Sequence, residues 1–189
     1  KKNVVCGFNL SCVGDDRAYS LIHSPSEKTL ADQALKAALI GKKNVKYYSF
    51  LERGSDERQY CSPKINLPLS GFSRSKNYPE YHTDKDDFKV VTEKGLQGSF
   101  EVIKSIIDAF EFGAFPKNQI YCEPNLGKRN LYPTTSQKGS YTKEIQLRSN
   151  IIAYADGKRS IFEISNLLNV NLKEVYNEYK ILKKKKLFQ

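Results

Sequence analysis

The sequence predicts an α/β fold with a mainly parallel sheet, followed by a small helical unit. In the first part of the chain, short apolar runs with β-branched residues alternate with segments whose apolar residues recur at helical spacing, and this alternation favours parallel strands joined by helices. From residue 141 the pattern changes to three short helical segments, which is typical of a helix-turn-helix unit. We therefore predict two domains, residues 1–139 and residues 140–189.

The first predicted elements are a strand, a helix and a second strand. Residues 4–13 form an apolar run that ends at Gly14-Asp15-Asp16, so they read as a buried strand entering a loop. Thr29-x-x-Asp32 resembles a capping box, and leucines and alanines follow it at helical spacing. We therefore predict a helix over residues 29–40. Residues 45–51 then alternate like a strand.

A short helix and a third strand come next. Ser55 or Asp56 can cap a helix over residues 57–61, which Pro63 ends. The apolar run at residues 65–69 contains a proline and predicts a short or bulged strand.

The rest of the chain is predominantly helical. Apolar residues on one face predict a helix over residues 98–112 that packs on the sheet. Residues 113–139 are rich in Pro, Gly, Asn and Ser and predict a connector. Three helical patterns follow, and the last of them ends in the lysine run at residues 183–186. Leu187 and Phe188 are candidates for the start of a wing strand.

The composition is that of a globular protein. Of the 189 residues, 39% are hydrophobic and 28% are charged. No apolar run approaches the roughly 20 residues that a membrane-spanning helix needs, and no secretion signal opens the chain. We therefore expect a cytoplasmic protein with no membrane partner. The net charge of +10 suits nucleic acid or an anionic surface, but it is only a weak indication of either.

The four cysteines show neither C-x-x-C spacing nor histidines at zinc-finger distance. We predict that they are reduced and mostly buried thiols: Cys6, Cys12, Cys61 and Cys122. Cys12 would be the exception if it lay next to a metal site.

One of only two histidines, His82, lies in the loop before the long helix and next to several carboxylates. A neutral imidazole is the commonest protein metal ligand, and its second ring nitrogen usually needs an acceptor. Asp84, Asp86 and Asp87 are candidate acceptors. The same residues are also typical of an ordinary surface turn, so the metal-ligand and surface-turn interpretations both stay open.

Asp15 follows the first predicted strand. In open α/β sheets ligands bind outside the carboxyl ends of the strands, which gives Asp15 a functional interpretation. An Asp that forms a turn after Gly14 is an equally good explanation.

Five blocks of the sequence, taken together and in this order, carry a resemblance to known proteins. They are Glu52-Arg53-Gly54-Ser55-Asp56-Glu57-Arg58-Gln59-Tyr60-Cys61-Ser62-Pro63, Asn66-Leu67-Pro68, Tyr78-Pro79-Glu80-Tyr81-His82-Thr83, Cys122-Glu123-Pro124-Asn125-Leu126-Gly127-Lys128-Arg129-Asn130-Leu131-Tyr132-Pro133 and Tyr154-Ala155-Asp156-Gly157. The blocks resemble a bacterial family with an aminopeptidase-like domain, often encoded near surface-polysaccharide genes. The family's fold is similar to that of zinc exopeptidases, and the last block opens a C-terminal winged-helix domain.

The resemblance implies a site with two zinc ions. In such exopeptidases the ions share a bridging Asp and are completed by two His, a Glu and a further acidic residue, while a separate Glu is the general base. Carried over by position, the last His matches His82, and the carboxylate after an inner strand matches Asp15, with Asp16 the less favoured choice. A zinc pair lowers the pKa of bound water and orients the peptide carbonyl.

The resemblance also implies residues around the metals. Asp56 matches a block that lines the site, Arg58 and Tyr60 would form pocket walls, and Asp86 would accept a hydrogen bond from His82.

The remaining members of the zinc set correspond to positions before Lys1. The chain also has no Met and enters a strand pattern almost at once, which indicates a fragment of a longer protein. His82 and Asp15 alone are too few ligands for a catalytic site, so we expect no catalytic residue in this chain and no turnover by it. The longer protein would bind two zinc ions and act on a peptide or an amide-containing small substrate. A homo-oligomer is compatible with the sequence.

Two functions of other classes stay open, a nucleic-acid-binding winged-helix regulator and a scaffold in surface-polysaccharide biosynthesis. Residues 141–189 hold 10 Lys and Arg against 5 Asp and Glu, a net charge of 10 − 5 = +5. The third predicted helix carries Glu174 and Glu178, however, which would face phosphates unfavourably. We therefore expect weak nucleic-acid binding and an interaction or packing role for this domain.

Overall fold

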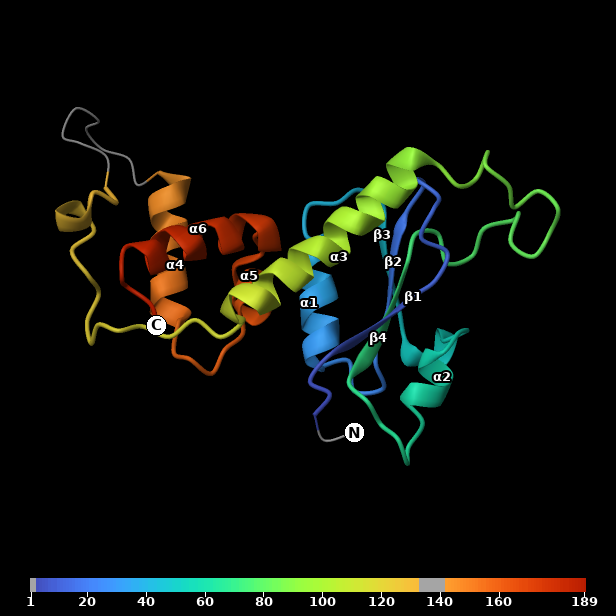
Figure 1. Cartoon of the computed structure of the whole chain (residues 1–189), viewed down its shortest axis with the longest axis horizontal. Coiled ribbons are helices and arrows are strands. Elements are labelled where there is room, and N and C mark those ends of the chain that lie inside the picture. The colour runs from blue at the N-terminus through green and yellow to red at the C-terminus, as the bar shows by residue number, and fades with distance from the viewer. Residues whose placement is uncertain (1–2, 133–141) are drawn as a thin grey trace.

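The computed structural model describes residues 3–132 and 142–189, and in it a four-stranded sheet is followed by a helical unit (Figure 1). The strands are β1 (Gly7–Leu10), β2 (Tyr19–Ile22), β3 (Val45–Tyr48) and β4 (Leu69–Ser73), in the spatial order β1-β4-β2-β3. The pairs β1–β4 and β2–β3 are parallel, whereas β2–β4 is antiparallel. The α/β class is confirmed, and the sheet is mixed, with two of its three strand pairs parallel.

One strand was not predicted and another was placed too early, and the antiparallel pair that these two strands form was therefore missed. The second strand, β2, was not predicted because it is short and includes the polar residues Tyr19 and Ser20. The third predicted strand, at residues 65–69, was placed too early: Ile65 ends a turn closed by the hydrogen bond from its amide to the Ser62 carbonyl, and the strand begins only at Leu69. This strand, β4, is built largely from small residues, which carry little β signal.

The first helix forms where the sequence predicts it. Helix α1 (Leu30–Leu39) begins after Thr29, whose side chain accepts from the Asp32 amide while the Asp32 side chain accepts from the Thr29 amide. This reciprocal capping box is confirmed. The inward side of α1 is almost fully buried, because it packs against β2 and β4 of the sheet and against the C-terminal unit.

The long helix α3 (Glu93–Gly113) begins one and a half turns earlier than predicted, because Thr92 caps it by accepting from the Gly95 amide. Its glycines permit close packing on the loop after β1. A Cβ atom at Gly95 would lie 1.9 Å from the Gly14 carbonyl oxygen. Helix α3 then runs from the sheet to the C-terminal unit, and α1 and α3 lie on the opposite side of the sheet from α2 (Glu57–Tyr60) (Figure 1).

The C-terminal unit consists of α4 (Lys143–Tyr154), α5 (Ile161–Leu168) and α6 (Leu172–Lys184), as predicted. Two isolated bridges, Lys117 with Asp156 and Asn118 with Phe188, join the segment after α3 to this unit. Phe188, a candidate for the start of a wing strand, thus forms a single bridge and belongs to no strand of the described residues. The predicted domain boundary at residue 139 lies outside the described residues. The described residues also form two short 3₁₀ helices, η1 (Phe50–Glu52) and η2 (Gly127–Arg129).

The two units share one hydrophobic core. Helix α5 packs on α1, and the rings of Phe110 in α3 and Phe162 in α5 lie 4.8 Å apart. Side-chain amides add polar contacts: Asn166 donates to the Gln33 carbonyl at 2.9 Å, and Asn171 donates to the Ile40 carbonyl at 2.6 Å. These contacts hold the helical unit in a fixed place against the sheet domain.

All four cysteines are free thiols, as predicted, but the expectation that most of them are buried is wrong, because Cys6 and Cys12 are only partly buried. Cys61 is buried, and burial raises its pKa, whereas Cys122 is exposed. Across residues 3–132 and 142–189, we find no helix long and apolar enough to cross a membrane.

Candidate functional site

The candidate site lies where β1 and β4 end. These strands are parallel neighbours, so the loop that holds Asp15 and the loop that holds His82 leave the same edge of the sheet. Asp15 is buried, with 4% of its surface exposed. Its carboxylate accepts hydrogen bonds from the Ser75 amide and the Ser75 hydroxyl, each at 2.7 Å, and from the Arg17 amide at 3.0 Å.

These hydrogen bonds determine the charge of Asp15. Burial alone would raise its pKa, but the bonds from Ser75 and Arg17 outweigh burial and leave the pKa below its ordinary value. Asp15 is therefore a carboxylate at neutral pH.

Arg17 connects the two loops. Its guanidinium lies 3.4 Å from Asp15 and donates to the Glu80 carboxylate at 3.1 Å and 3.2 Å. Glu80 is two residues before His82, so this bridge holds the base of the histidine loop beside Asp15. Asp16 takes a different partner, because its carboxylate pairs with Lys94 at 3.0 Å.

His82 stands at an exposed and conformationally unusual position. Its φ of 62° is in the left-handed region, and its ring centroid lies 3.9 Å from that of Tyr81. Asp86 accepts from the Tyr78 hydroxyl at 2.8 Å. In the part of the chain that the structure describes, no hydrogen bond joins His82 to Asp86, so that contact stays a prediction.

A cavity of about 350 Å³ opens between these loops and α3. Asp15 and Asp86 supply carboxylates to its wall, and Tyr78 and Tyr81 supply aromatic rings. Burial and the hydrogen bond to Asp86 raise the pKa of Tyr78, so its hydroxyl stays protonated as a donor. The rest of the lining is mostly apolar: Val13, Val90, Val91 and Leu96.

A second cavity, of about 190 Å³, lies over β1 and β4 and borders the first at Cys12 and Tyr81. Three residues of the sequence block at residues 52–63 line this cavity: Gly54, Ser55 and Glu57. Its lining does not include the predicted pocket residues of that block. These are all exposed: Asp56, Arg58 and Tyr60. Their role as pocket walls stays a prediction.

Glu57 is the buried carboxylate of this block. It accepts from the Gly54 amide at 2.8 Å, the Ser55 amide at 3.0 Å and the Asn9 side-chain amide. Burial alone would raise the pKa of Glu57, but these hydrogen bonds outweigh burial and leave the pKa below its ordinary value. Sequence reasoning did not single out Glu57, although its position just after Ser55-Asp56 at a helix start is a capping signal.

The second histidine, His23, belongs to a separate polar cluster at the opposite edge of the sheet, where β2 ends. Its Nδ1 lies 3.1 Å from Asp32, which is 2% exposed. Asp32 also accepts from the amides and hydroxyls of Ser24 and Thr29 and from the Ser70 hydroxyl. The sequence identified Asp32 only as a helix cap.

Comparison with known proteins adds the family. The sequence model of a family described as a domain of unknown function (DUF4910) matches residues 1–113. The chain belongs to this family. A model described as winged helix-turn-helix matches residues 114–189. The helical unit is therefore of the winged-helix class, as expected.

Two relatives extend the likeness over most of the chain. A Clostridium acetobutylicum protein, provisionally named as a polysaccharide biosynthesis protein with an aminopeptidase-like domain, is 29% identical over 172 residues, which cover 87% of this chain and 38% of that protein. A crystal structure from Clostridium acetobutylicum, provisionally described as a peptidase, superposes with a TM-score of 0.80 and 25% identity over 100% of this chain and 42% of that one. The chain thus spans about two fifths of these relatives.

The family likeness raises the question of a zinc site. Across the described residues, no group of three or more His, Cys, Asp and Glu side chains is arranged to hold a metal ion. Both carboxylate oxygens of Asp15 already accept hydrogen bonds from Ser75. A catalytic zinc needs three protein ligands, so the residues of this chain do not fit a zinc ion by themselves.

Proposed function

We propose that this chain is the C-terminal part of a zinc-dependent, aminopeptidase-like hydrolase of surface-polysaccharide biosynthesis, acting in the cytoplasm on a peptide or an amide-containing small molecule. The observation that carries the proposal is the bridge from Asp15 through Arg17 to Glu80, which holds the His82 loop beside a buried carboxylate. The likeness to the aminopeptidase-like relative supports the same class.

In this proposal the chain supplies an incomplete ligand set. His82 and Asp15 contribute one imidazole and one carboxylate, and the other ligands and the general base come from elsewhere in the longer protein. Such metals supply activated water for hydrolysis. The residues of this chain would orient the Asp15 carboxylate through Ser75 and Arg17 and form an aromatic and apolar wall for the substrate.

The experiment is hydrolysis of a panel of aminoacyl p-nitroanilides by the full-length protein. We expect His82→Ala to lower kcat/KM by at least about a hundredfold. Even replacing a residue that only hydrogen-bonds to a metal ligand lowers metal affinity or activity by about 10–100-fold. His82 is exposed, so loss of folding should not mimic this effect. Lys85→Ala, in the same exposed loop, is the matched control and should leave kcat/KM within about twofold. Equal activity of the His82→Ala and wild-type proteins would refute the metal-ligand role.

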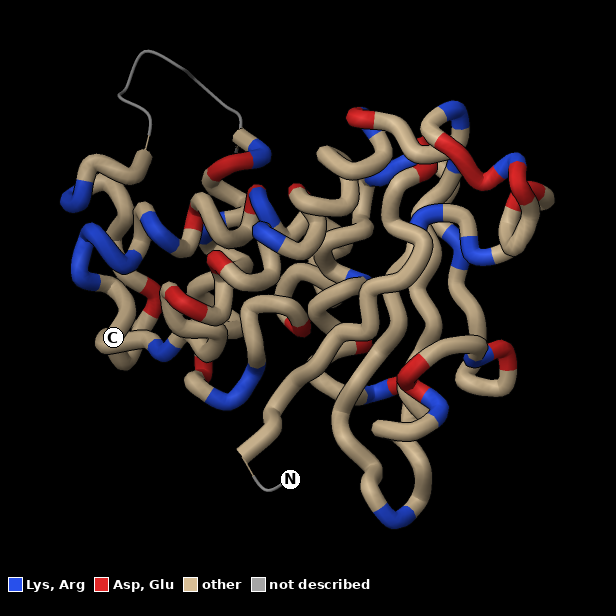
Figure 2. The backbone as a smooth tube through the Cα atoms, turned by 45° about the vertical axis from the view of Figure 1, so that its right-hand side comes forward, with Lys and Arg blue, Asp and Glu red and all other residues tan. Residues whose placement is uncertain are grey.

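A second candidate function, nucleic-acid binding, is favoured by the winged-helix match. Basic residues lie along much of the described backbone, and a continuous run of them precedes the C-terminus (Figure 2). Helix α6, the third helix of the unit, has one side turned toward α3 across a groove, to which it contributes Lys173, Tyr176 and Lys180. That side cannot enter a DNA major groove while the two units stay packed together.

We therefore expect only weak and non-specific DNA binding by the chain. If the lysines at residues 183–186 engage four phosphates, the slope of log affinity against log salt will be about −3.6, and binding will be lost near physiological salt. Titration of the chain with random and genomic duplexes at several salt concentrations measures this slope. Nanomolar binding of one duplex over random competitor at physiological salt would show that the regulator hypothesis is right.

A further inference from the structure

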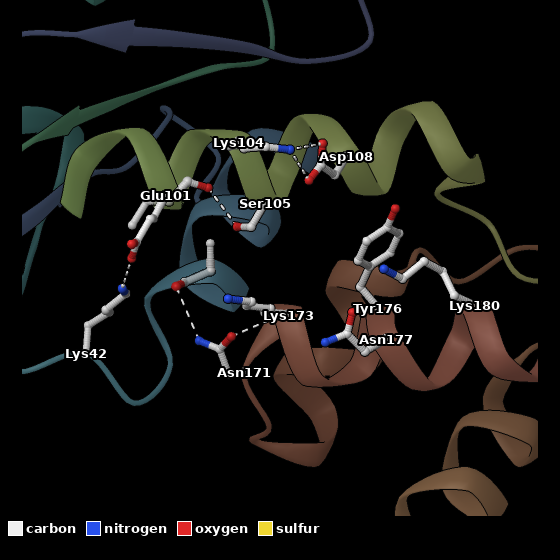
Figure 3. A pocket seen from close by; sticks show the side chains of 12 residues that line it. Lys42, Glu101, Lys104, Ser105, Asp108, Asn171, Lys173, Tyr176, Asn177 and Lys180 are labelled. Carbon is white, nitrogen blue, oxygen red and sulfur yellow. Dashed lines mark hydrogen bonds and ion pairs between the residues drawn. The ribbon is translucent and has the colours of Figure 1, made fainter. Parts of the chain in front are cut away.

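A groove of about 320 Å³ runs between α3, α6 and the end of α1 (Figure 3). Its lining includes no residue of the Asp15 loop or the His82 loop. Its volume is in the range of small-ligand pockets. Both units contribute to it, so a molecule bound there would contact the sheet domain and the winged-helix unit at once. The charged residues in its lining are four lysines and two acids: Lys42, Lys104, Lys173, Lys180, Glu101 and Asp108.

The charges of the groove do not cancel. Lys104 pairs with Asp108 at 2.6 Å, and Lys42 lies 3.6 Å from Glu101. These pairs use both acids of the lining, so Lys173 and Lys180 add a net charge of +2. Within the described part of the chain, neither of these two lysines has a carboxylate within ion-pair distance. The lining thus holds both signs of charge with lysine in excess, and a net positive charge in a pocket attracts anions.

The two lysines are held on a fixed frame. Helix α6 carries both of them, seven residues apart, which places their backbones about 10.5 Å apart along the helix axis. Lys180 Nζ lies 4.3 Å from the ring centroid of Tyr176, which stands between them in the groove (Figure 3). The start of the helix is fixed by Asn171, whose side chain accepts from the Lys173 amide at 2.9 Å and donates to the Ile40 carbonyl.

From this geometry we propose that the groove binds a small phosphorylated molecule with at least two negative charges, of which a diphosphate group is the simplest form. Lysine is a common phosphate ligand that acts as a point charge. The stems of Lys173 and Lys180 can converge on adjacent phosphates from the two ends of the groove. Asn177, also in the lining, offers an amide to a phosphate oxygen or to the rest of the ligand.

The test uses inorganic pyrophosphate as the probe and isothermal titration of the whole 189-residue chain at physiological and constant ionic strength. We expect saturable binding of one pyrophosphate, with sodium chloride as the blank. The double variant Lys173→Ala with Lys180→Ala should weaken it at least about tenfold, since each lost charged hydrogen bond is worth roughly that factor. Lys184→Ala with Lys185→Ala removes the same charge from the exposed end of the same helix and should change the affinity by less than about twofold.

Amide hydrogen exchange locates the bound probe independently. Pyrophosphate should slow exchange in residues 101–108 and 171–180, on both sides of the groove. The proposal is overturned if pyrophosphate does not bind at physiological salt, if both double variants lose affinity equally, or if protection falls only on the lysine run at residues 183–186.

Discussion

Replacing Asp32 with Ala should lower the free energy of unfolding by about 3–5 kcal/mol, because removal of a buried charged acceptor leaves its partners unsatisfied. Asp32 is 2% exposed and accepts from five amide and hydroxyl groups of Ser24, Thr29 and Ser70, besides its contact with His23. It thereby connects the end of β2, the start of α1 and strand β4. Loss of the carboxylate affects all three elements.

Urea unfolding followed by circular dichroism measures the effect. The exposed Asp84→Ala variant is the control and should differ from the wild type by less than about 0.5 kcal/mol. A change of similar size in both variants would mean that the Asp32 cluster is not a major source of stability.

The same residue gives a pH dependence. Burial would raise the pKa of Asp32, but hydrogen bonds from Ser24, Thr29 and Ser70 outweigh burial and lower it. A lowered folded-state pKa means that its contribution is fully present above the unfolded value of about 3.9 and is lost as the pH falls through the folded value. The stability difference between wild type and Asp32→Ala should therefore be constant near neutral pH and shrink in acid below about pH 4.

Replacing Phe162 with Ala should also cost about 3–5 kcal/mol, through the cavity that it leaves in the core. Phe162 is fully buried on α5 and lies against Phe110 of α3. Because α5 also packs on α1, we expect the loss to destabilise the sheet domain and the winged-helix unit together. Leu167→Ala, on the same helix but 53% exposed, should cost less than about 1 kcal/mol.

Amide exchange in α1 and in α5, measured across a urea series, tests the shared core. In the Phe162→Ala variant both helices should lose protection at the same lowered urea concentration. If α5 opens first while α1 keeps its wild-type protection, the two units are independent and the groove between them is not a fixed site.

Local signals in the sequence predict much of the helical structure. The capping box of Thr29 and Asp32 locates α1, and apolar periodicity locates α3 and the three helices of the winged-helix unit. Sheet order is harder to predict, because it depends on contacts between distant segments. The short strand β2 lies antiparallel to β4, more than forty residues later in the chain, and its own sequence carries no signal of that pairing.

In the candidate site, too, local features could be predicted from the sequence and long-range contacts could not. Asp15 and His82 could be proposed from the sequence, and the structure brings their loops to one edge of the sheet. The groups that hold Asp15 in place are far away in the chain, since Ser75 is sixty residues beyond it. Arg17 is close in sequence, but its second partner, Glu80, lies sixty-three residues on. Such long-range polar contacts follow from the fold and leave no local pattern.

The zinc content of the full-length protein is the most direct test of the proposed hydrolase. Our account predicts about two zinc ions per full-length chain by intact mass and elemental analysis, a loss of metal in the His82→Ala variant, and no stoichiometric zinc on the 189-residue chain alone. A full-length protein that binds no zinc and releases no p-nitroaniline from any aminoacyl substrate would contradict it.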